Sequence, residues 1–147
     1  MGALFVVALM PVAAQAGEID EVMVPLQAYL DGHATGEERY FRRAFAPDGV
    51  LVGTKDGRYG QRPVQDYITA SSSGRVPDDE ARRRRWIHSV TVTGQVATAV
   101  IELDYPDMRA HDHMSLVKFE DGWRIVVKAY DASTPEPANA QEVRHER

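Results

Sequence analysis

Apolar residues recur along the chain at two spacings, and each spacing predicts a different kind of element. Between Glu18 and Gly32 the apolar positions follow the period of a helix, and a second helix is expected over Glu37–Phe45. A third, short helix should begin at Pro63, because proline has no N–H to leave unpaired in the first turn. Three helices therefore fall in the first half of the chain.

Shorter apolar runs, separated by turn residues, predict strands. Asp121-Gly122 is the clearest turn, because glycine readily adopts the positive φ that a tight hairpin needs. Helices on one side of a strongly bent antiparallel sheet make an α+β fold. Three short helices cannot fill the concave side of such a sheet, so we expect a pocket there. The predicted strands are Val50–Val52, Arg58–Gly60, Trp86–Thr93, Ala97–Tyr105, Ala110–Phe119 and Trp123–Tyr130.

The N-terminal segment is apolar in a different way. Leu4–Ala14 is almost unbroken and is followed by a small-x-small pattern, so residues 1–16 resemble a signal peptide cleaved after Ala16. The run is shorter than the roughly 20 apolar residues that span a bilayer. We expect a secreted or periplasmic protein. No Lys or Arg precedes the run, so a misassigned start, and with it a cytoplasmic protein, is the alternative, as is a helix packed on the domain.

Length and composition describe one ordinary globular domain, expected over residues 17–132 of the 147, with a disordered tail over 133–147. The formal net charge of -5 argues against nucleic acid and anionic membranes as partners. Cysteine is absent, which excludes disulfides and thiol catalysis. The acidic run Asp78–Glu80 stands one residue before four arginines, Arg82–Arg85, and largely balances their charge. We therefore interpret the arginines as the solvated start of a strand.

Three stretches of the chain resemble the nuclear transport factor 2-like superfamily: Tyr29–Leu51, Val90–Asp107 and Leu116–Ala132. Within it, the chain is most similar to the group named putative lumazine-binding domains, relatives of the SnoaL-like polyketide cyclases. The resemblance implies a cone-shaped sheet wrapped on about three N-terminal helices. It also implies a homodimer formed through the convex face and a pocket for a small, partly apolar molecule. It implies neither a cofactor nor a particular reaction, because many functions share one fold.

The ketosteroid isomerases of this superfamily use a helix-one tyrosine and a protonated aspartate as an oxyanion hole, together with an aspartate base. By this resemblance Tyr29 takes the place of the tyrosine. Gly53 falls where the base should be, and Ser115 falls where the second donor should be. Neither can fill its role, so we do not expect a steroid-isomerase mechanism.

If Ser115 faces the pocket, the alternation of a strand places His113 there as well. On the last strand the same comparison turns Val126, Lys128 and Tyr130 inward, and Trp123, Ile125 and Val127 outward. Lys128 needs a partner if it is buried, either an anionic ligand or a carboxylate such as Asp104 or Asp112. The residues expected to line the pocket are Tyr29, Tyr67, His88, His113, Ser115, Lys128 and Tyr130.

His113 is the main candidate for acid–base chemistry, with Tyr29 as its partner, because a neutral imidazole exchanges protons near neutral pH. A strand histidine with a satisfied hydrogen bond is the alternative. His33, between two helices, is interpreted as making a capping or loop hydrogen bond, with a catalytic or ligand role as the alternative. His111 shares a face with His113 but Asp112 does not, so no metal site is expected.

Two main functions stay open. One is a binding or accessory module without catalysis. The other is a lyase, isomerase or cyclase that uses His113 and Tyr29. They differ in whether His113, Tyr29 and Lys128 converge on one cavity. A protein-interaction domain that binds through the convex sheet is a third possibility.

Overall fold

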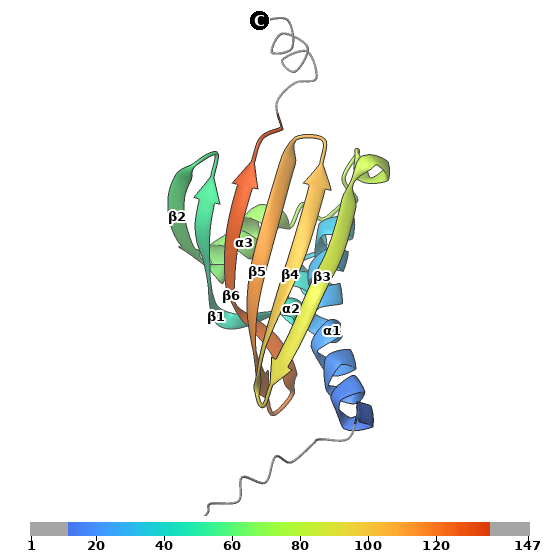
Figure 1. Ribbon diagram of the computed structural model, residues 1–147. Coiled ribbons are helices and arrows are strands. Elements are labelled where there is room, and N and C mark those ends of the chain that lie inside the picture. The colour runs from blue at the N-terminus through green and yellow to red at the C-terminus, as the bar shows by residue number, and fades with distance from the viewer. Residues whose placement is uncertain (1–11, 136–147) are drawn as a thin grey trace, which may run out of the picture.

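The computed structural model describes residues 12–135 and places three helices against one face of a six-stranded sheet (Figure 1). The element order agrees with the order predicted from the sequence, and the predicted α+β class is confirmed. The helices are α1 (Val12–Thr35), α2 (Glu38–Ala44) and α3 (Val64–Ser71), with a short 3-10 turn at Glu80–Arg82. The strands are β1 (Phe45–Lys55), β2 (Arg58–Pro63), β3 (Arg84–Thr93), β4 (Val96–Tyr105), β5 (Met108–Phe119) and β6 (Gly122–Ser133).

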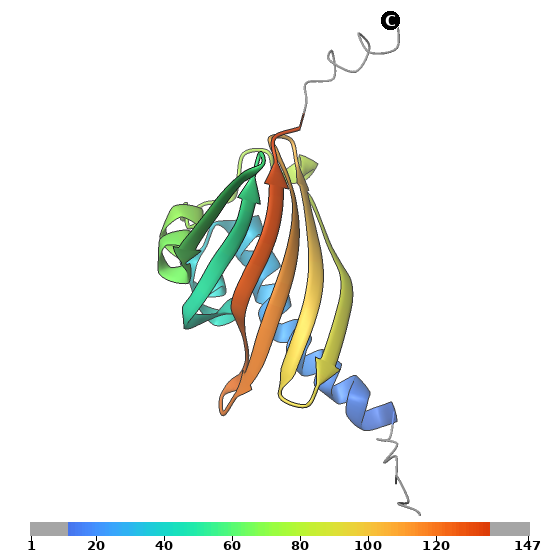
Figure 2. The same ribbon diagram turned by 60° about the vertical axis from the view of Figure 1, so that its left-hand side comes forward.

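The strands lie in the order β2-β1-β6-β5-β4-β3, and the sheet curves around the helices without closing (Figure 2). Neighbouring strands are antiparallel except β1 and β6, which are parallel. The expectation of a wholly antiparallel sheet is therefore wrong at this one pair. The two backbones approach closely there: a Cβ added to Gly53 would lie 1.9 Å from the carbonyl oxygen of Tyr130. Glycine thus occupies this position because no side chain fits.

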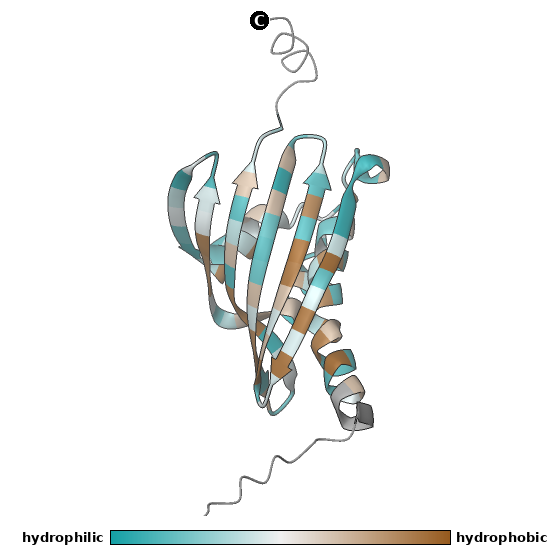
Figure 3. Cartoon of the chain, in the orientation of Figure 1, coloured by the Kyte–Doolittle hydropathy of each residue, from teal (hydrophilic) through white to brown (hydrophobic). Residues whose placement is uncertain are grey.

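The core lies between the helices and the concave face of the sheet. Strand β4 shows why: its alternate residues are buried, and Figure 3 shows hydrophobic and hydrophilic positions alternating toward its end. The helices supply the other half of the core, chiefly through Leu26 and Tyr29 of α1 and Phe41 of α2, all fully buried. The inward residues of β4 are Ala97, Ala99, Ile101, Leu103 and Tyr105.

An irregularity in the β5–β6 ladder decides which side chains of β6 face the core. Ser115 pairs with Val127 and Leu116 pairs with Ile125, so Val126 has no partner residue. An extra residue of this kind resets the alternation along a strand. Trp123 and Ile125 are consequently buried, together with Lys128. The prediction that turned Trp123 and Ile125 outward is wrong for this reason, whereas the inward direction of Lys128 is confirmed.

On β5 the buried residues are Ala110, Asp112, Met114 and Leu116. His113 and Ser115 alternate with them and lie on the outward face of the sheet. The prediction that placed these two side chains in the pocket is wrong by one residue of register. Asp112 faces the core, where the prediction placed His113.

Both chain ends extend past the described residues. Residues 1–11 of the predicted signal peptide and residues 136–147 of the predicted tail lie outside them. Helix α1 begins at Val12, so the predicted cleavage position after Ala16 falls within this helix. Export stays a prediction. Within residues 12–135, no helix is both long and apolar enough to cross a membrane.

Candidate functional site

A buried cluster of three polar side chains joins α1 to the middle of the sheet. The Nζ of Lys128 donates to the hydroxyl of Tyr29 over 2.6 Å and lies 3.0 Å from Oδ2 of Asp112. The Tyr29 hydroxyl in turn donates to the same carboxylate oxygen over 2.6 Å. Asp112 is 0% exposed and Lys128 is 5% exposed. Each charge therefore has the partner that burial demands, and Asp112 is one of the two carboxylates predicted to pair with Lys128.

Aromatic rings surround the ammonium group of Lys128. Its Nζ lies 4.9 Å from the ring centre of Tyr29, 5.1 Å from that of Tyr67 and 5.6 Å from that of Tyr130. A cation is attracted to the negative faces of such rings. Burial has the largest single effect and would lower the pKa of Lys128, but the carboxylate of Asp112 and the neighbouring Tyr67 together outweigh it and raise that pKa. Lys128 thus stays charged at neutral pH.

The three groups largely satisfy one another. Burial, and then the negative charge of Asp112, raise the pKa of Tyr29 well above its ordinary value, so Tyr29 keeps its proton and directs it to Asp112. An oxyanion hole needs donors that are free for the substrate. Within this cluster only Oδ1 of Asp112 lacks a hydrogen-bond partner, and it is an acceptor. The cluster holds α1 on the sheet and does not form an oxyanion hole.

A cavity of about 590 Å³ opens at one end of the molecule. We call it the mouth cavity. It lies between the end of α1, the segment that follows α3, and the β4–β5 turn. Its lining combines aromatic and apolar surface with charged groups of both signs. The lining residues are His33, Gly36, Lys55, Ser71, Ser73, Arg75, Pro77, Asp78, Asp79, Arg83, Tyr105, Asp107 and Met108.

His33 connects the mouth cavity to the buried cluster. It is partly exposed and lines the cavity, and its Nε2 lies 2.8 Å from the hydroxyl of Tyr67, whose ring faces Lys128. Burial, followed by the positive charges of Lys128, Arg85 and Arg83, lowers the pKa of His33 well below its ordinary value. His33 is therefore a neutral imidazole at neutral pH, and the same burial and positive charges make it a weaker base than an ordinary histidine.

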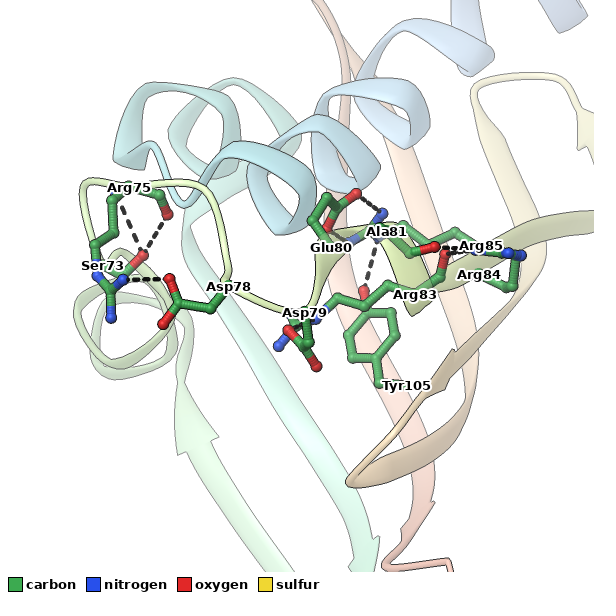
Figure 4. Close-up of polar contacts among 10 residues, drawn as sticks. All are labelled: Ser73, Arg75, Asp78, Asp79, Glu80, Ala81, Arg83, Arg84, Arg85 and Tyr105. Atoms are coloured by element: carbon green, nitrogen blue, oxygen red, sulfur yellow. Dashed lines mark hydrogen bonds and ion pairs between the residues drawn. The ribbon is translucent and has the colours of Figure 1, made fainter.

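Arg83, just before β3, and Arg85, the second residue of β3, pack on Tyr105 (Figure 4). Arg85 makes two 2.7 Å contacts with the carboxylate of Glu80, and its Nε donates to the Tyr105 hydroxyl over 2.8 Å. Arg83 pairs with Asp79 over 2.8 Å. The predicted balance of arginines by the preceding acids is confirmed for these two. Their solvated character is not: the Arg85 side chain is 11% exposed, because it lies opposite inward-facing Leu103.

The structure brings together four of the predicted pocket residues, namely Tyr29, Tyr67, Lys128 and Tyr130. Tyr29 and Lys128 belong to the buried cluster, and the rings of Tyr67 and Tyr130 lie next to Lys128. None of the four lines the mouth cavity. The remaining three, His88, His113 and Ser115, lie on the outward face. The Nε2 of His88 is bound there to Glu102 over 2.7 Å. The predicted pairing of His113 with Tyr29 is therefore wrong, because the two side chains lie on opposite sides of the sheet.

Sequence reasoning missed Tyr105 and Arg83, which line the cavity, and Arg85, which bonds Tyr105. It predicts a capping or loop hydrogen bond for His33, whereas this residue lines the cavity and contacts Tyr67. Within the described part of the chain, no three His, Asp or Glu side chains are placed so that they could hold a metal ion. The homodimer expected through the outward face stays a prediction.

Comparisons with known proteins agree with this architecture. A family model described as putative lumazine-binding matches residues 17–131. The chain is 22% identical over 116 residues to Aldolase FrzH from Cladobotryum sp, covering 77% of this chain and 90% of that protein. A nuclear transport factor 2-like protein of unknown function from Shewanella baltica superposes with a TM-score of 0.69 at 22% identity, over 80% of this chain and 94% of that one. A similar protein from Silicibacter pomeroyi gives 0.67 at 24% identity, over 84% and 99%. These structural likenesses bear on the fold alone.

Proposed function

The chain belongs to the putative lumazine-binding family, and we propose that it binds a small, planar, partly apolar molecule in the mouth cavity. The observation that carries this proposal is the cavity itself: about 590 Å³, within the range of roughly 300–1,000 Å³ typical of ligand sites. His33 and Tyr105 give the lining aromatic surface, which suits a partly apolar ring. The charged groups around the opening suit polar substituents.

Binding without catalysis is the function that the geometry favours. The buried cluster directs the Tyr29 proton to Asp112 and pairs the Lys128 ammonium with Tyr29 and Asp112, and none of these three residues lines the mouth cavity. A flat heterocycle with carbonyl groups, such as lumazine itself, has the size and shape that the cavity can hold.

Filling the mouth cavity should abolish binding. Met108 is half-buried at the start of β5 and lines the cavity, so Met108→Trp should occupy ligand space. We expect several members of a library of planar carbonyl heterocycles, lumazine included, to bind the wild-type protein. Met108→Trp should weaken these ligands by at least about tenfold, the equivalent of about 1.4 kcal/mol. Ligand-observed NMR measures both effects.

Val96→Trp is the matched control, because Val96 is 53% exposed and does not line the cavity. It should bind the same compounds as the wild type. A library without any binder, or binders that Met108→Trp leaves unaffected, would contradict the proposed site.

A second candidate function is carbon–carbon bond chemistry next to a carbonyl group. The position of His33 in the cavity lining favours it, because an unprotonated imidazole there has a lone pair with which to take the proton from the carbon beside a carbonyl and leave an enolate. Its lowered pKa makes it a weaker base than an ordinary histidine. The likeness to a protein named as an aldolase supports the same class. In this role His33 replaces His113.

Hydrogen exchange tests the second candidate. The methyl protons of acetone in deuterated water should exchange faster with the protein present than in buffer alone, as followed by proton NMR. His33→Gln should remove the acceleration, because glutamine can bond Tyr67 but cannot act as the base. His113→Gln, on the outward face, should retain it. Exchange at the buffer rate with wild-type protein would leave binding alone as the function.

A further inference from the structure

The hydroxyl of Tyr105 has one hydrogen-bonding capacity that the protein does not use. It accepts a hydrogen bond from Nε of Arg85 over 2.8 Å, which occupies one oxygen lone pair. A tyrosine hydroxyl also carries one hydrogen that it can donate. Among residues 12–135, no acceptor for that hydrogen is found. Tyr105 is only 5% exposed and lines the mouth cavity, so a bound molecule is a natural acceptor.

Two cationic side chains lie over the ring that carries this hydroxyl. The guanidinium carbons of Arg83 and Arg85 lie 4.4 Å and 5.0 Å from the centre of the Tyr105 ring. Figure 4 shows the hydroxyl directed toward Arg85, which Glu80 holds in place. A phenol that accepts a bond from a cation becomes a stronger donor itself, because successive hydrogen bonds polarise one another.

The hydroxyl keeps its proton in spite of these cations. Burial raises the pKa of Tyr105, and the two arginines offset only part of that effect. At neutral pH Tyr105 is therefore a donor and not a base. Neutral His33 lies next to it, with ring centres 5.9 Å apart. One side of the cavity thus offers a polarised donor, and the adjacent side offers an acceptor of protons.

We propose that the Tyr105 hydroxyl, polarised by Arg85, binds a carbonyl oxygen of the ligand in the mouth cavity. The proposal rests on the proposed function and narrows its ligand class to ketones and other carbonyl compounds. The carbonyl oxygen lies at Tyr105, and the carbon next to the carbonyl lies toward His33. Tyr105 is a binding residue, and Arg85 is the positioning residue that acts through it.

Two probes of the same shape test the proposal. Acetylnaphthalene has a carbonyl oxygen, whereas ethylnaphthalene has none. We expect the wild-type protein to bind the ketone about tenfold more tightly, the effect of one hydrogen bond from a polarised donor. Tyr105→Phe should remove this preference and leave the binding of ethylnaphthalene unchanged. Tyr59→Phe, at a tyrosine that is 71% exposed on β2, should keep the preference.

The carbonyl stretching frequency of bound acetylnaphthalene separates a direct bond from a structural effect. It should be lower in the wild-type complex than in the Tyr105→Phe complex. The double variant Glu80→Gln with Arg85→Gln removes the cation without leaving a charge unpaired, and it should give an intermediate frequency.

The outcomes separate a failure of the carbonyl site from a failure of the mouth cavity as the ligand site. If both probes bind equally well and Tyr105→Phe changes neither affinity nor frequency, the carbonyl site is refuted while the cavity stands. If neither probe binds, the proposed function is contradicted, and the carbonyl site with it.

Discussion

Replacing Lys128 with methionine should lower the free energy of unfolding by about 3–5 kcal/mol, the usual cost of removing one partner of a buried ion pair. Methionine leaves the carboxylate of Asp112 buried with only the Tyr29 hydroxyl to stabilise it. The aromatic rings of Tyr29, Tyr67 and Tyr130 lose their central cation as well. Denaturant unfolding followed by circular dichroism measures the change.

A triple variant separates loss of the pair from loss of packing. Tyr29→Phe, Asp112→Leu and Lys128→Met together replace the cluster with apolar side chains of similar volume. Such replacements are often neutral or stabilising when every member is removed, so the triple variant should regain most of the lost stability. A Lys128→Met variant as stable as the wild type would contradict this account, because it would show that the Asp112 carboxylate does not need Lys128 as its buried partner.

Acid should destabilise the protein through His33. The unfolded chain takes up a proton on this histidine near its ordinary pKa of about 6.5, whereas the folded protein keeps His33 neutral to well below that pH. In this interval the unfolded state binds more protons. The free energy of unfolding therefore falls as the pH falls below about 6.5, by up to about 1.4 kcal/mol per pH unit. Above that pH, both states are neutral at His33 and the contribution is constant.

The difference between wild type and variant isolates this one group. His33→Gln preserves a polar group for the Tyr67 hydroxyl but cannot be protonated, so its unfolding free energy should fall less steeply between pH 6.5 and the lower folded pKa of His33. His113→Gln is the control, because His113 is exposed on the outward face, and it should follow the wild type. Parallel curves for wild type and His33→Gln would show that His33 is not held neutral.

The architecture could be predicted because hydrophobic spacing and turn residues specify it locally. The hairpin at Asp121-Gly122 and the helical spacing around Tyr29 and Leu26 both correspond to elements of the structure. The parallel pairing of β1 with β6 is different. It joins the two ends of the domain, and no local pattern marks which strands far apart in the chain become neighbours.

The sequence is sufficient to predict which residues of β5 face the core. Met114 and Leu116 alternate with His113 and Ser115, so the apolar pattern alone turns Asp112 inward. Reliance on the family resemblance placed Ser115 inward instead. On β6, by contrast, nothing in the sequence marks the unpaired Val126, because neither glycine nor proline stands there.

The mouth cavity could not be predicted from the sequence. His33 and Tyr105 come from the end of α1 and the end of β4, and they meet only because the curved sheet brings these ends together. Arg85 could be recognised as balanced by acids, but its contact with Tyr105 depends on the pairing of β3 with β4. A site formed by residues this far apart in the sequence can be recognised only once the fold is known.

A crystal structure of the protein soaked with the strongest-binding planar carbonyl compound tests most directly whether the mouth cavity is the ligand site. We predict density for the compound between His33 and Tyr105. Density for the compound in another surface pocket, with only solvent in the mouth cavity, would contradict the assignment of the mouth cavity as the ligand site.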